Sequence, residues 1–258
     1  MFFMLEYLYL YESEVFCLAK VITVLSGKGG VGKSTFCANI GKALSKNKKV
    51  LLIDGDVAFR SLDILLDLGS QVVFDWSDVI FDRCTKEKAL IVVYAKLHLL
   101  AAPLSLSENF CEEDFKRLIE SFSEKYDYIF IDSPAGFNEI TEIYAKVSDE
   151  IIVIATPDDI SLRAAYITGE KLINNGIDDN KMRLVLNKAD FRQMKNGRQR
   201  NLDDAVDKTY LRLLGVIPTD KSLTDVWGND GNLLSIRANK AFLQIAERIL
   251  GKDVKLYF

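Results

Sequence analysis

The feature of the sequence that most constrains its fold is a series of seven short, unbroken runs rich in Val, Ile and Leu. They lie at residues 21–25, 50–54, 97–102, 128–132, 151–155, 183–187 and 214–218. Because they are uniformly apolar rather than alternating, the runs are typical of strands covered on both faces, as in a parallel sheet. Segments with helical periodicity separate them, at residues 34–46, 108–124, 137–147, 160–175, 201–213 and 233–250. The pattern predicts an α/β fold: a single doubly wound, mostly parallel sheet with helices on both faces.

A further short run, at residues 91–94, lies only two residues before the run at 97–102. Ala95 and Lys96 are too few to form a crossover between parallel strands, whereas two residues are enough for a hairpin between antiparallel strands. We therefore expect one antiparallel pair in an otherwise parallel sheet. No stretch with the Pro, Gly and Ser bias of a linker divides residues 20–251, so they are expected to form one domain.

Composition narrows the class of protein. The chain has 258 residues and a formal net charge of -4, so any nucleic-acid binding would need a local basic patch. Its four cysteines are widely spaced, which favours buried thiols in a reducing cytoplasm over a disulfide scaffold or a metal site within one chain. Beyond the N-terminus, no segment is long and apolar enough to span a membrane, and a cytoplasmic protein is expected.

Residues 1–19 form an N-terminal extension that is aromatic and apolar but carries Glu6, Glu12 and Glu14. The first basic residue is Lys20, so the segment lacks the basic start of a secretory signal, and its charges argue against a spanning helix. An added strand or helix, an arm that docks a partner, and a poorly ordered extension are all compatible with it.

The sequence after the first run contains a complete phosphate-binding motif. Gly27, four residues and then Gly32-Lys33-Ser34 fit G-x-x-x-x-G-K-[ST], between an expected strand and an expected helix. Glycines let main-chain N–H groups turn inward around a phosphate, and the helix N-terminus adds positive partial charge. Lys33 would bind the β- and γ-phosphates, and the Ser34 hydroxyl would bind Mg²⁺. The residues expected to contact the nucleotide here are Gly27, Lys28, Gly29, Gly30, Val31, Gly32, Lys33, Ser34 and Thr35.

Three aspartates follow two of the other apolar runs. Asp54 and Asp56 come at the end of the run at 50–54, and Asp132 ends the run at 128–132. The carboxyl ends of parallel strands share one edge of the sheet, where ligands bind. Asp132 fits a Walker B carboxylate that holds Mg²⁺ through water. Gly136, in the switch loop that follows, is placed to offer its N–H to the γ-phosphate.

Lys28 gives the loop a second lysine, and "KGGVGKS" resembles the deviant phosphate loop of the MinD/ParA ATPases, which are P-loop NTPases of the SIMIBI type. In that family the early lysine reaches across a sandwich dimer to the other subunit's nucleotide, stabilising charge in trans as an arginine finger does. "DSPAG" at 132–136 is similar to the MinD branch, as is the arginine before Leu-Asp that follows "DGD". The resemblance implies an ATP-bound homodimer.

The resemblance also implies roles for the aspartates. Asp56 would orient the attacking water, which makes Lys28, Lys33 and Asp56 the expected catalytic residues. Asp54 would support the Mg²⁺ shell, so the expected metal residues are Ser34, Asp54 and Asp132. ATP and Mg²⁺ are the expected cofactors.

Two further motifs bear on the choice of base. "LNKAD" at 186–190 contains N-K-x-D, which reads guanine in many GTPases. MinD-like proteins place an asparagine here against adenine, and "IPTD" at 217–220 resembles their base-flanking loop. Asn187, Lys188 and Pro218 are therefore candidate base contacts. The early lysine is the rarer feature and favours ATP, with a GTPase metallochaperone of the same superfamily as the alternative.

The resemblance spans about residues 20–251 and implies a spatial-positioning switch, in cell division or a related MinD-like role, that ATP hydrolysis resets and a protein regulator stimulates. A nucleotide-dependent scaffold with negligible hydrolysis is a second alternative. MinD proteins that bind membranes end in a basic amphipathic helix, whereas residues 252–258 supply only a short tail. Such a tail would need dimer avidity to hold the protein at the inner face of the cell membrane. The basic residues within 192–200 make DNA a less favoured partner.

Overall fold

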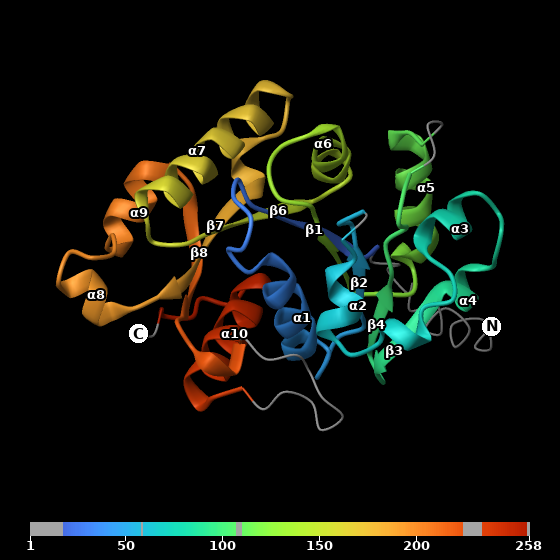
Figure 1. The fold of residues 1–258 in the computed structure, drawn as a ribbon, viewed down its shortest axis with the longest axis horizontal. Coiled ribbons are helices and arrows are strands. Elements are labelled where there is room, and N and C mark those ends of the chain that lie inside the picture. The colour runs from blue at the N-terminus through green and yellow to red at the C-terminus, as the bar shows by residue number, and fades with distance from the viewer. Residues whose placement is uncertain (1–17, 58, 107–109, 224–233, 257–258) are drawn as a thin grey trace, which may run out of the picture.

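The computed structural model describes residues 18–57, 59–106, 110–223 and 234–256, and within them eight strands form a single sheet (Figure 1). The strands are β1 (Lys20–Leu25), β2 (Val50–Asp54), β3 (Leu90–Tyr94), β4 (Leu97–Leu100), β5 (Tyr128–Asp132), β6 (Glu150–Ala155), β7 (Met182–Ala189) and β8 (Arg212–Pro218). Their order across the sheet is β3-β4-β2-β5-β1-β6-β7-β8. All neighbouring pairs are parallel except β3 and β4, which form an antiparallel hairpin at one edge. The predicted mostly parallel sheet and the predicted hairpin are both confirmed.

The same described residues contain ten α-helices and three short 3₁₀ helices. The α-helices are α1 (Lys33–Leu44), α2 (Ser61–Leu65), α3 (Trp76–Ile80), α4 (Lys86–Ala89), α5 (Glu112–Ser123), α6 (Glu139–Lys146), α7 (Asp159–Asn174), α8 (Phe191–Lys195), α9 (Leu202–Thr209) and α10 (Ile236–Ile249). The 3₁₀ helices are η1 (Gly69–Gln71), η2 (Asp179–Lys181) and η3 (Lys221–Leu223).

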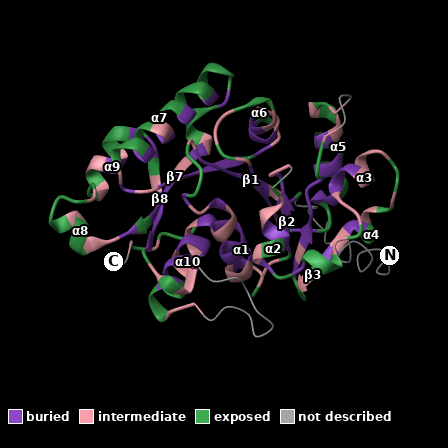
Figure 2. Cartoon of the chain, in the orientation of Figure 1, coloured by how far each residue is buried: buried purple, intermediate pink, exposed green. Residues whose placement is uncertain are grey.

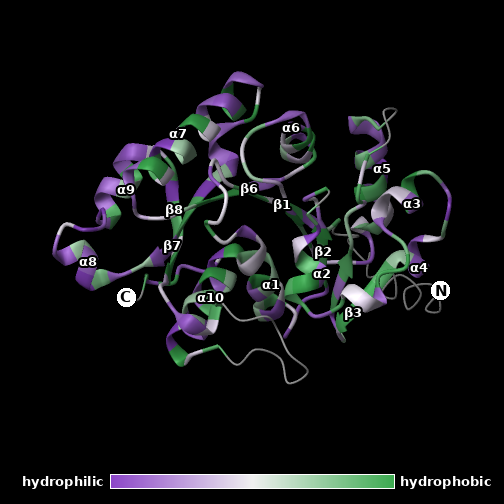
Figure 3. Ribbon diagram, viewed as in Figure 1, coloured by the Kyte–Doolittle hydropathy of each residue, from purple (hydrophilic) through white to green (hydrophobic). Residues whose placement is uncertain are grey.

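Helices cover both faces of the sheet. On one face lie α1, α2 and α10, and on the other lie α3, α5, α6, α7 and α9 (Figure 1). Neighbouring residues of one strand face opposite sides, since Leu52 packs with the first group of helices and Leu51 and Ile53 pack with the second. The strands are therefore buried and apolar, while the outer helix faces are exposed and polar (Figure 2, Figure 3). Burial on both faces is the physical reason for the unbroken apolar runs.

Each predicted strand is present, but several predicted element bounds are wrong. The helix expected at 201–213 ends at Thr209, because Tyr210 adopts a left-handed conformation with φ 55° and β8 begins at Arg212. The strand expected at 97–102 ends at Leu100. Four helices of four or five residues, α2, α3, α4 and α8, were not predicted, because so short a segment shows no helical periodicity.

Parts of four predictions fall outside the described residues, including residue 233 at the start of the helix expected at 233–250. Most of the N-terminal extension (1–17) and the last two residues of the tail (257–258) are among them. Residues 107–109, near the start of the helix expected at 108–124, also lie outside, and α5 begins at Glu112. Among the helices in the described ranges, none combines the length and apolar character that crossing a membrane requires.

The carboxyl ends of β1, β2 and β5 meet at one edge of the sheet. β1 ends at Leu25, just before the glycine-rich loop, and Asp54 of β2 lies opposite Asp132 of β5 in the parallel register. Within the sheet, β5 and β2 lie on one side of β1, and β6 lies on its other side. Open α/β sheets bind ligands at the carboxyl ends of strands where the connections diverge in this way.

Candidate nucleotide-binding site

Two glycines explain how the loop after β1 folds. A Cβ atom at Gly27 would lie 2.3 Å from the carbonyl oxygen of Ala164 in α7, so no side chain fits there. Gly32 has φ 100°, a left-handed conformation that favours glycine, and its Cβ would lie 2.4 Å from Asn187 Nδ2. The loop is therefore packed tightly against α7 and β7 before it enters α1.

The ammonium group of Lys33, the first residue of α1, lies inside the loop. Its Nζ donates a hydrogen bond to Ser26 Oγ at 3.0 Å, and the residue is only 8% exposed. Ser26 Oγ donates in turn to the carbonyl oxygen of Lys28 at 2.9 Å. The first turn of α1 carries no acidic residue and no side-chain cap. The helix N-terminus and Lys33 together form a positively charged site suited to phosphate.

Asp132 is a fully buried carboxylate at the end of β5. Among the described residues, neither of its oxygens has a hydrogen-bond partner of standard geometry. Burial raises the pKa of the Asp132 carboxyl, and the nearby Ser34 hydroxyl and Lys33 ammonium only partly oppose this rise. An unpartnered carboxylate in the protein interior is costly. The position therefore fits a carboxylate that binds a cation or the water of a cation.

Asp54, opposite Asp132, is equally buried but its oxygens are engaged. Oδ1 accepts a hydrogen bond from the Asp56 N–H at 3.0 Å, and Oδ2 accepts one from the Leu62 N–H at 2.8 Å. Burial and the neighbouring Asp132 raise the pKa of the Asp54 carboxyl. Asp54 thus fixes the loop between β2 and α2. That loop carries Asp56, which is half-buried and lines the cavity.

The residues around Ser34 fit a Mg²⁺ ion that is bound together with phosphates. Within the described ranges, no three Asp, Glu, His or Cys side chains converge as a metal-binding cluster. Mg²⁺ usually binds through one or two carboxylates, water and phosphate oxygens rather than in an all-protein cage. Ser34 lines the cavity, and its Oγ lies 2.9 Å from Ser61 Oγ of α2 and close to the Asp132 carboxylate.

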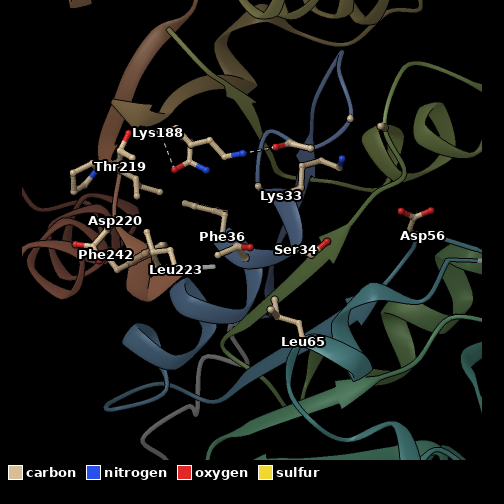
Figure 4. A pocket seen from close by; sticks show the side chains of 18 of the residues that line it. Lys33, Ser34, Phe36, Asp56, Leu65, Lys188, Thr219, Asp220, Leu223 and Phe242 are labelled. Atoms are coloured by element: carbon tan, nitrogen blue, oxygen red, sulfur yellow. Dashed lines mark hydrogen bonds between the residues drawn. The ribbon is translucent and has the colours of Figure 1, made fainter. Parts of the chain in front are cut away.

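A cavity of about 830 Å³ lies over the loop and continues toward α10. The predicted site residues that line it are Gly29, Gly30, Gly32, Lys33, Ser34, Thr35, Asp56, Asn187, Lys188 and Pro218. Figure 4 shows Lys33 near the centre, with Asp56 on one side and Phe242 on the other. The volume is within the range of small-molecule sites. One end is charged and the other apolar, as a nucleotide's phosphates and base require.

Six predicted site residues do not line this cavity: Gly27, Lys28, Val31, Asp54, Asp132 and Gly136. Lys28 is directed elsewhere, because its Nζ lies 3.8 Å from Asp158 Oδ1 just before α7, and both residues line a separate cavity of about 280 Å³. The Gly136 N–H donates to the carbonyl oxygen of Ser26 at 2.8 Å. A contact between this N–H and a phosphate requires the loop after β5 to rearrange.

Asn187 and Lys188, predicted as base contacts, both hold the phosphate loop. Asn187 Nδ2 donates to the carbonyl oxygen of Val31, and Lys188 Nζ donates to that of Gly30, each at 2.7 Å. Lys188 has a φ of 57°, so its backbone adopts a left-handed conformation that is uncommon for a residue with a side chain. Both residues also line the cavity, so they connect the loop to the site expected for the base.

The apolar end of the cavity was largely missed in the sequence. Phe36 and Phe242 lie there with ring centroids 6.1 Å apart, together with Ile217 and Leu223. Asp220 adds a carboxylate to the same wall. Ile217 and Asp220 belong to the "IPTD" motif, which could have identified them, whereas Phe242 lies in α10 and is brought in only by the tertiary fold.

A phosphate loop between the first strand and first helix of a doubly wound sheet places the chain in the class of P-loop nucleoside triphosphatases. A family model described as "AAA domain" matches residues 19–184. Septum site-determining protein MinD of Thermotoga maritima is 33% identical over 247 residues, which cover 93% of this chain and 91% of that protein. MinD of Bacillus subtilis is 33% identical over 249 residues, covering 93% and 92%. The chain belongs to the MinD family of the MinD/ParA ATPases.

Solved structures agree with this assignment. The MinC:MinD cell division protein complex of Aquifex aeolicus contains a chain with a TM-score of 0.84 and 32% identity, covering 93% of this chain and 99% of that one. MinD of Pyrococcus horikoshii, complexed with Mg-ADP, has a TM-score of 0.74 at 24% identity and covers 90% and 96%. The second likeness supports the fold alone.

Proposed function

We propose that the chain is a Mg²⁺-dependent ATPase that forms an ATP-sandwiched homodimer and acts as a spatial-positioning switch, reset by hydrolysis. The observation that carries the proposal is the different placement of two lysines in one loop. Lys33 is buried beside Ser26 at the phosphate end of the cavity, whereas the Lys28 ammonium group lies outside that cavity, beside Asp158. A second cation in the motif that does not serve its own subunit's phosphates is expected to serve those of a partner subunit.

The geometry supports specific roles for the other residues. Lys33 and the N-terminus of α1 bind the β- and γ-phosphates, and Ser34 ligates the Mg²⁺ that balances their charge. Asp132 holds water of the metal shell, and Asp54 contributes by fixing the loop that carries Asp56. Asp56 lines the cavity on the phosphate side and orients the attacking water. Mg²⁺ supplies charge stabilisation on the phosphate oxygens when it is bound.

The structure favours ATP over GTP as the nucleotide. Guanine recognition by N-K-x-D uses the aspartate, which is Asp190 here. Asp190 instead caps α8, because its Oδ1 accepts from the N–H groups of Arg192 and Gln193, and it does not line the cavity. Competition binding with ATP and GTP tests the choice, and a clear preference for GTP would support the metallochaperone alternative.

Two substitutions in the loop test the central proposal. Lys33→Ala should abolish nucleotide binding. Lys28→Ala should retain ATP binding but lose ATP-dependent dimerisation, or lower phosphate release by about 10²–10³-fold, as loss of one charge-stabilising group does elsewhere. Lys46→Ala, at an exposed lysine just after α1, is the matched control. Light scattering with ATP and Mg²⁺ measures dimerisation, and a monomeric wild-type protein under these conditions would contradict the trans-lysine mechanism.

Negligible phosphate release from the wild type, even with added partners, would favour the alternative of a nucleotide-dependent scaffold. A protein regulator that stimulates hydrolysis is part of the proposal. The complex of MinD with MinC in Aquifex aeolicus supports a protein partner for this family.

For the cell location, we propose the cytoplasm with peripheral contact to the inner face of the cell membrane through residues 252–258. DNA is the less favoured partner, because Arg200 of the basic patch already pairs with Asp159, with Nη2 2.6 Å from Oδ2. Co-sedimentation with anionic vesicles, with and without ATP, tests membrane contact when repeated after deletion of residues 252–258. ATP-dependent sedimentation that survives the deletion would exclude the tail as the contact.

A further inference from the structure

Gly55 lies between Asp54 and Asp56, and its backbone is held by two neighbouring elements. Its N–H donates a hydrogen bond to the carbonyl oxygen of Asp132, at the end of β5, at 2.8 Å. Its carbonyl oxygen accepts one from the hydroxyl of Tyr144 in α6 at 3.1 Å. A Cβ atom at Gly55 would lie 2.7 Å from Cε2 of Tyr144, so the aromatic ring packs directly against the backbone. The start of the loop after β2 is therefore fixed between β5 and α6.

Tyr144 belongs to a buried aromatic cluster that packs against this loop. Its ring centroid lies 4.7 Å from that of Phe115 in α5, and the Phe115 ring lies 5.6 Å from that of Trp76 in α3. Trp76 Nε1 donates to the carbonyl oxygen of Asp54 at 2.9 Å. Burial raises the pKa of the Tyr144 hydroxyl above its usual value, and the nearby Asp54 and Asp56 raise it further, so the group keeps the proton that it donates. The two polar members of the cluster thus hold consecutive carbonyl groups of the loop.

The position of the Asp56 carboxylate depends on its backbone. The Asp56 N–H donates to Asp54 Oδ1 at 3.0 Å, but among the described residues no donor bonds to the Asp56 carboxylate. The carbonyl group of Gly55 and the N–H of Asp56 belong to one planar peptide, so a bond to the first orients the second. This carbonyl oxygen also accepts from the Val57 N–H at 3.0 Å, which is a bond within the loop. The Tyr144 hydroxyl is therefore the group that ties this peptide's carbonyl to the rest of the described protein.

We propose that Tyr144 is a positioning residue, which places the Asp56 carboxylate through the carbonyl oxygen of Gly55. The inference rests on the proposed function, because it concerns how Asp56 reaches the attacking water. Displacing a group by about 1 Å can lower a reaction rate about 10²-fold, so a single hydrogen bond at this peptide is enough to affect hydrolysis. Since α6 begins at Glu139, three residues after Gly136, Tyr144 also links the loop after β5 to the loop after β2.

Two substitutions of buried tyrosines test the role of this hydroxyl. Tyr144→Phe removes it and keeps the ring that packs against Phe115 and Gly55. Tyr126→Phe is the matched control. Tyr126 is 3% exposed and lies in the same hydrophobic core as Tyr144, and among the described residues its buried hydroxyl has no hydrogen-bond partner. Each substitution removes the same atom, but only Tyr144→Phe removes a bond to the loop.

Steady-state phosphate release from ATP with Mg²⁺ measures the effect on the reaction. Tyr144→Phe should lower kcat by about tenfold, because the group that orients the water is no longer held in place. The KM for ATP should stay within about twofold of the wild-type value, because Tyr144 does not line the nucleotide cavity. Tyr126→Phe should match the wild type in both constants. An unchanged kcat in Tyr144→Phe, an equal loss in both variants, or a raised KM with kcat unchanged would each overturn the proposal.

Amide hydrogen exchange without nucleotide separately tests whether Tyr144 holds the loop. Exchange follows local opening, so the amides of residues 55–57 should exchange about tenfold faster in Tyr144→Phe than in the wild type. Tyr126→Phe should leave these rates unchanged. Equal exchange in Tyr144→Phe and the wild type would overturn the proposal even if kcat falls. A wild-type protein that releases no phosphate would instead refute the proposed ATPase function, and the exchange rates would still decide whether Tyr144 holds the loop.

Discussion

Replacing Asp132 by asparagine should stabilise the nucleotide-free protein while it abolishes Mg²⁺-dependent nucleotide binding. Asp132 is 0% exposed, and among the described residues its oxygens have no hydrogen-bond partner of standard geometry. Burial raises the pKa of its carboxyl, so the folded state binds more protons than the unfolded chain. The wild type should therefore lose stability as pH rises through the folded pKa. The variant should show less of this pH dependence.

The expected gain in the free energy of unfolding follows from the buried, unpartnered charge that Asp132→Asn removes. A buried polar group without a partner costs about 1–3 kcal/mol, and more when it is charged. The asparagine amide is itself polar and retains part of this cost, so a net gain of about 1–2 kcal/mol is expected near neutral pH. For a chain of this size each kcal/mol corresponds to about 2–4 °C in Tm.

Asp54→Asn is the matched control for this prediction. It removes the same charge at the opposite register position, but its new NH₂ group would replace an oxygen that accepts from the N–H of Asp56 or Leu62. Asp54→Asn should therefore stabilise the protein less than Asp132→Asn does, or destabilise it. Thermal unfolding between about pH 4 and 8, without nucleotide, measures both variants over the range in which Asp132 loses its proton in the folded state, whose pKa is about 6. The reasoning is refuted if Asp132→Asn lowers Tm, or if Asp54→Asn stabilises more than Asp132→Asn does.

Three other substitutions test local packing and capping by urea unfolding, and nucleotide binding is measured for the two glycine variants. Gly27→Ala should destabilise by about 3 kcal/mol and abolish nucleotide binding, because its Cβ would lie 2.3 Å from a backbone oxygen of Ala164; unchanged binding would refute this. Gly215→Ala should cost about 1–3 kcal/mol without altering nucleotide affinity, since its Cβ would lie 2.4 Å from the Ile245 side chain. Asp75→Ala should lower the free energy of unfolding by about 1 kcal/mol, because it removes the capping box of α3. An unchanged free energy of unfolding would show that the capping box does not contribute to stability.

The sheet could be predicted from the sequence because its physical cause is local and strong. A strand buried on both faces needs an apolar residue at every position, and β2, β5 and β6 satisfy this without exception up to the aspartates or glutamate at their ends. Helix ends are different, because they depend on single residues. Thr209 ends α9 through a left-handed Tyr210, which is an unusual conformation for tyrosine that no periodicity reveals.

The phosphate end of the site could also be predicted, because its residues are contiguous in the chain. Lys33 and Ser34 are neighbours, and a strand–loop–helix context fixes their positions. The apolar end depends on residues more than two hundred positions apart, since Phe36 of α1 meets Phe242 of α10. Asn187 is a third case. The sequence pointed to this residue as a site residue, but it did not show that the side-chain amide donates a hydrogen bond to the carbonyl oxygen of Val31.

Lys28 illustrates why a motif alone does not define where a side chain acts. Its ion pair with Asp158 has an N–O distance of 3.8 Å, and the two side chains are 45% and 46% exposed. Exposed pairs of this kind contribute at most about 1 kcal/mol, so releasing Lys28 toward a partner subunit costs little. Asp158 keeps its other contacts when the pair breaks, because its oxygens accept from the Ser161 N–H and the Thr156 hydroxyl. The loop therefore combines one lysine held firmly by burial with a second lysine held weakly at the surface, as the proposed dimer-dependent ATPase would require.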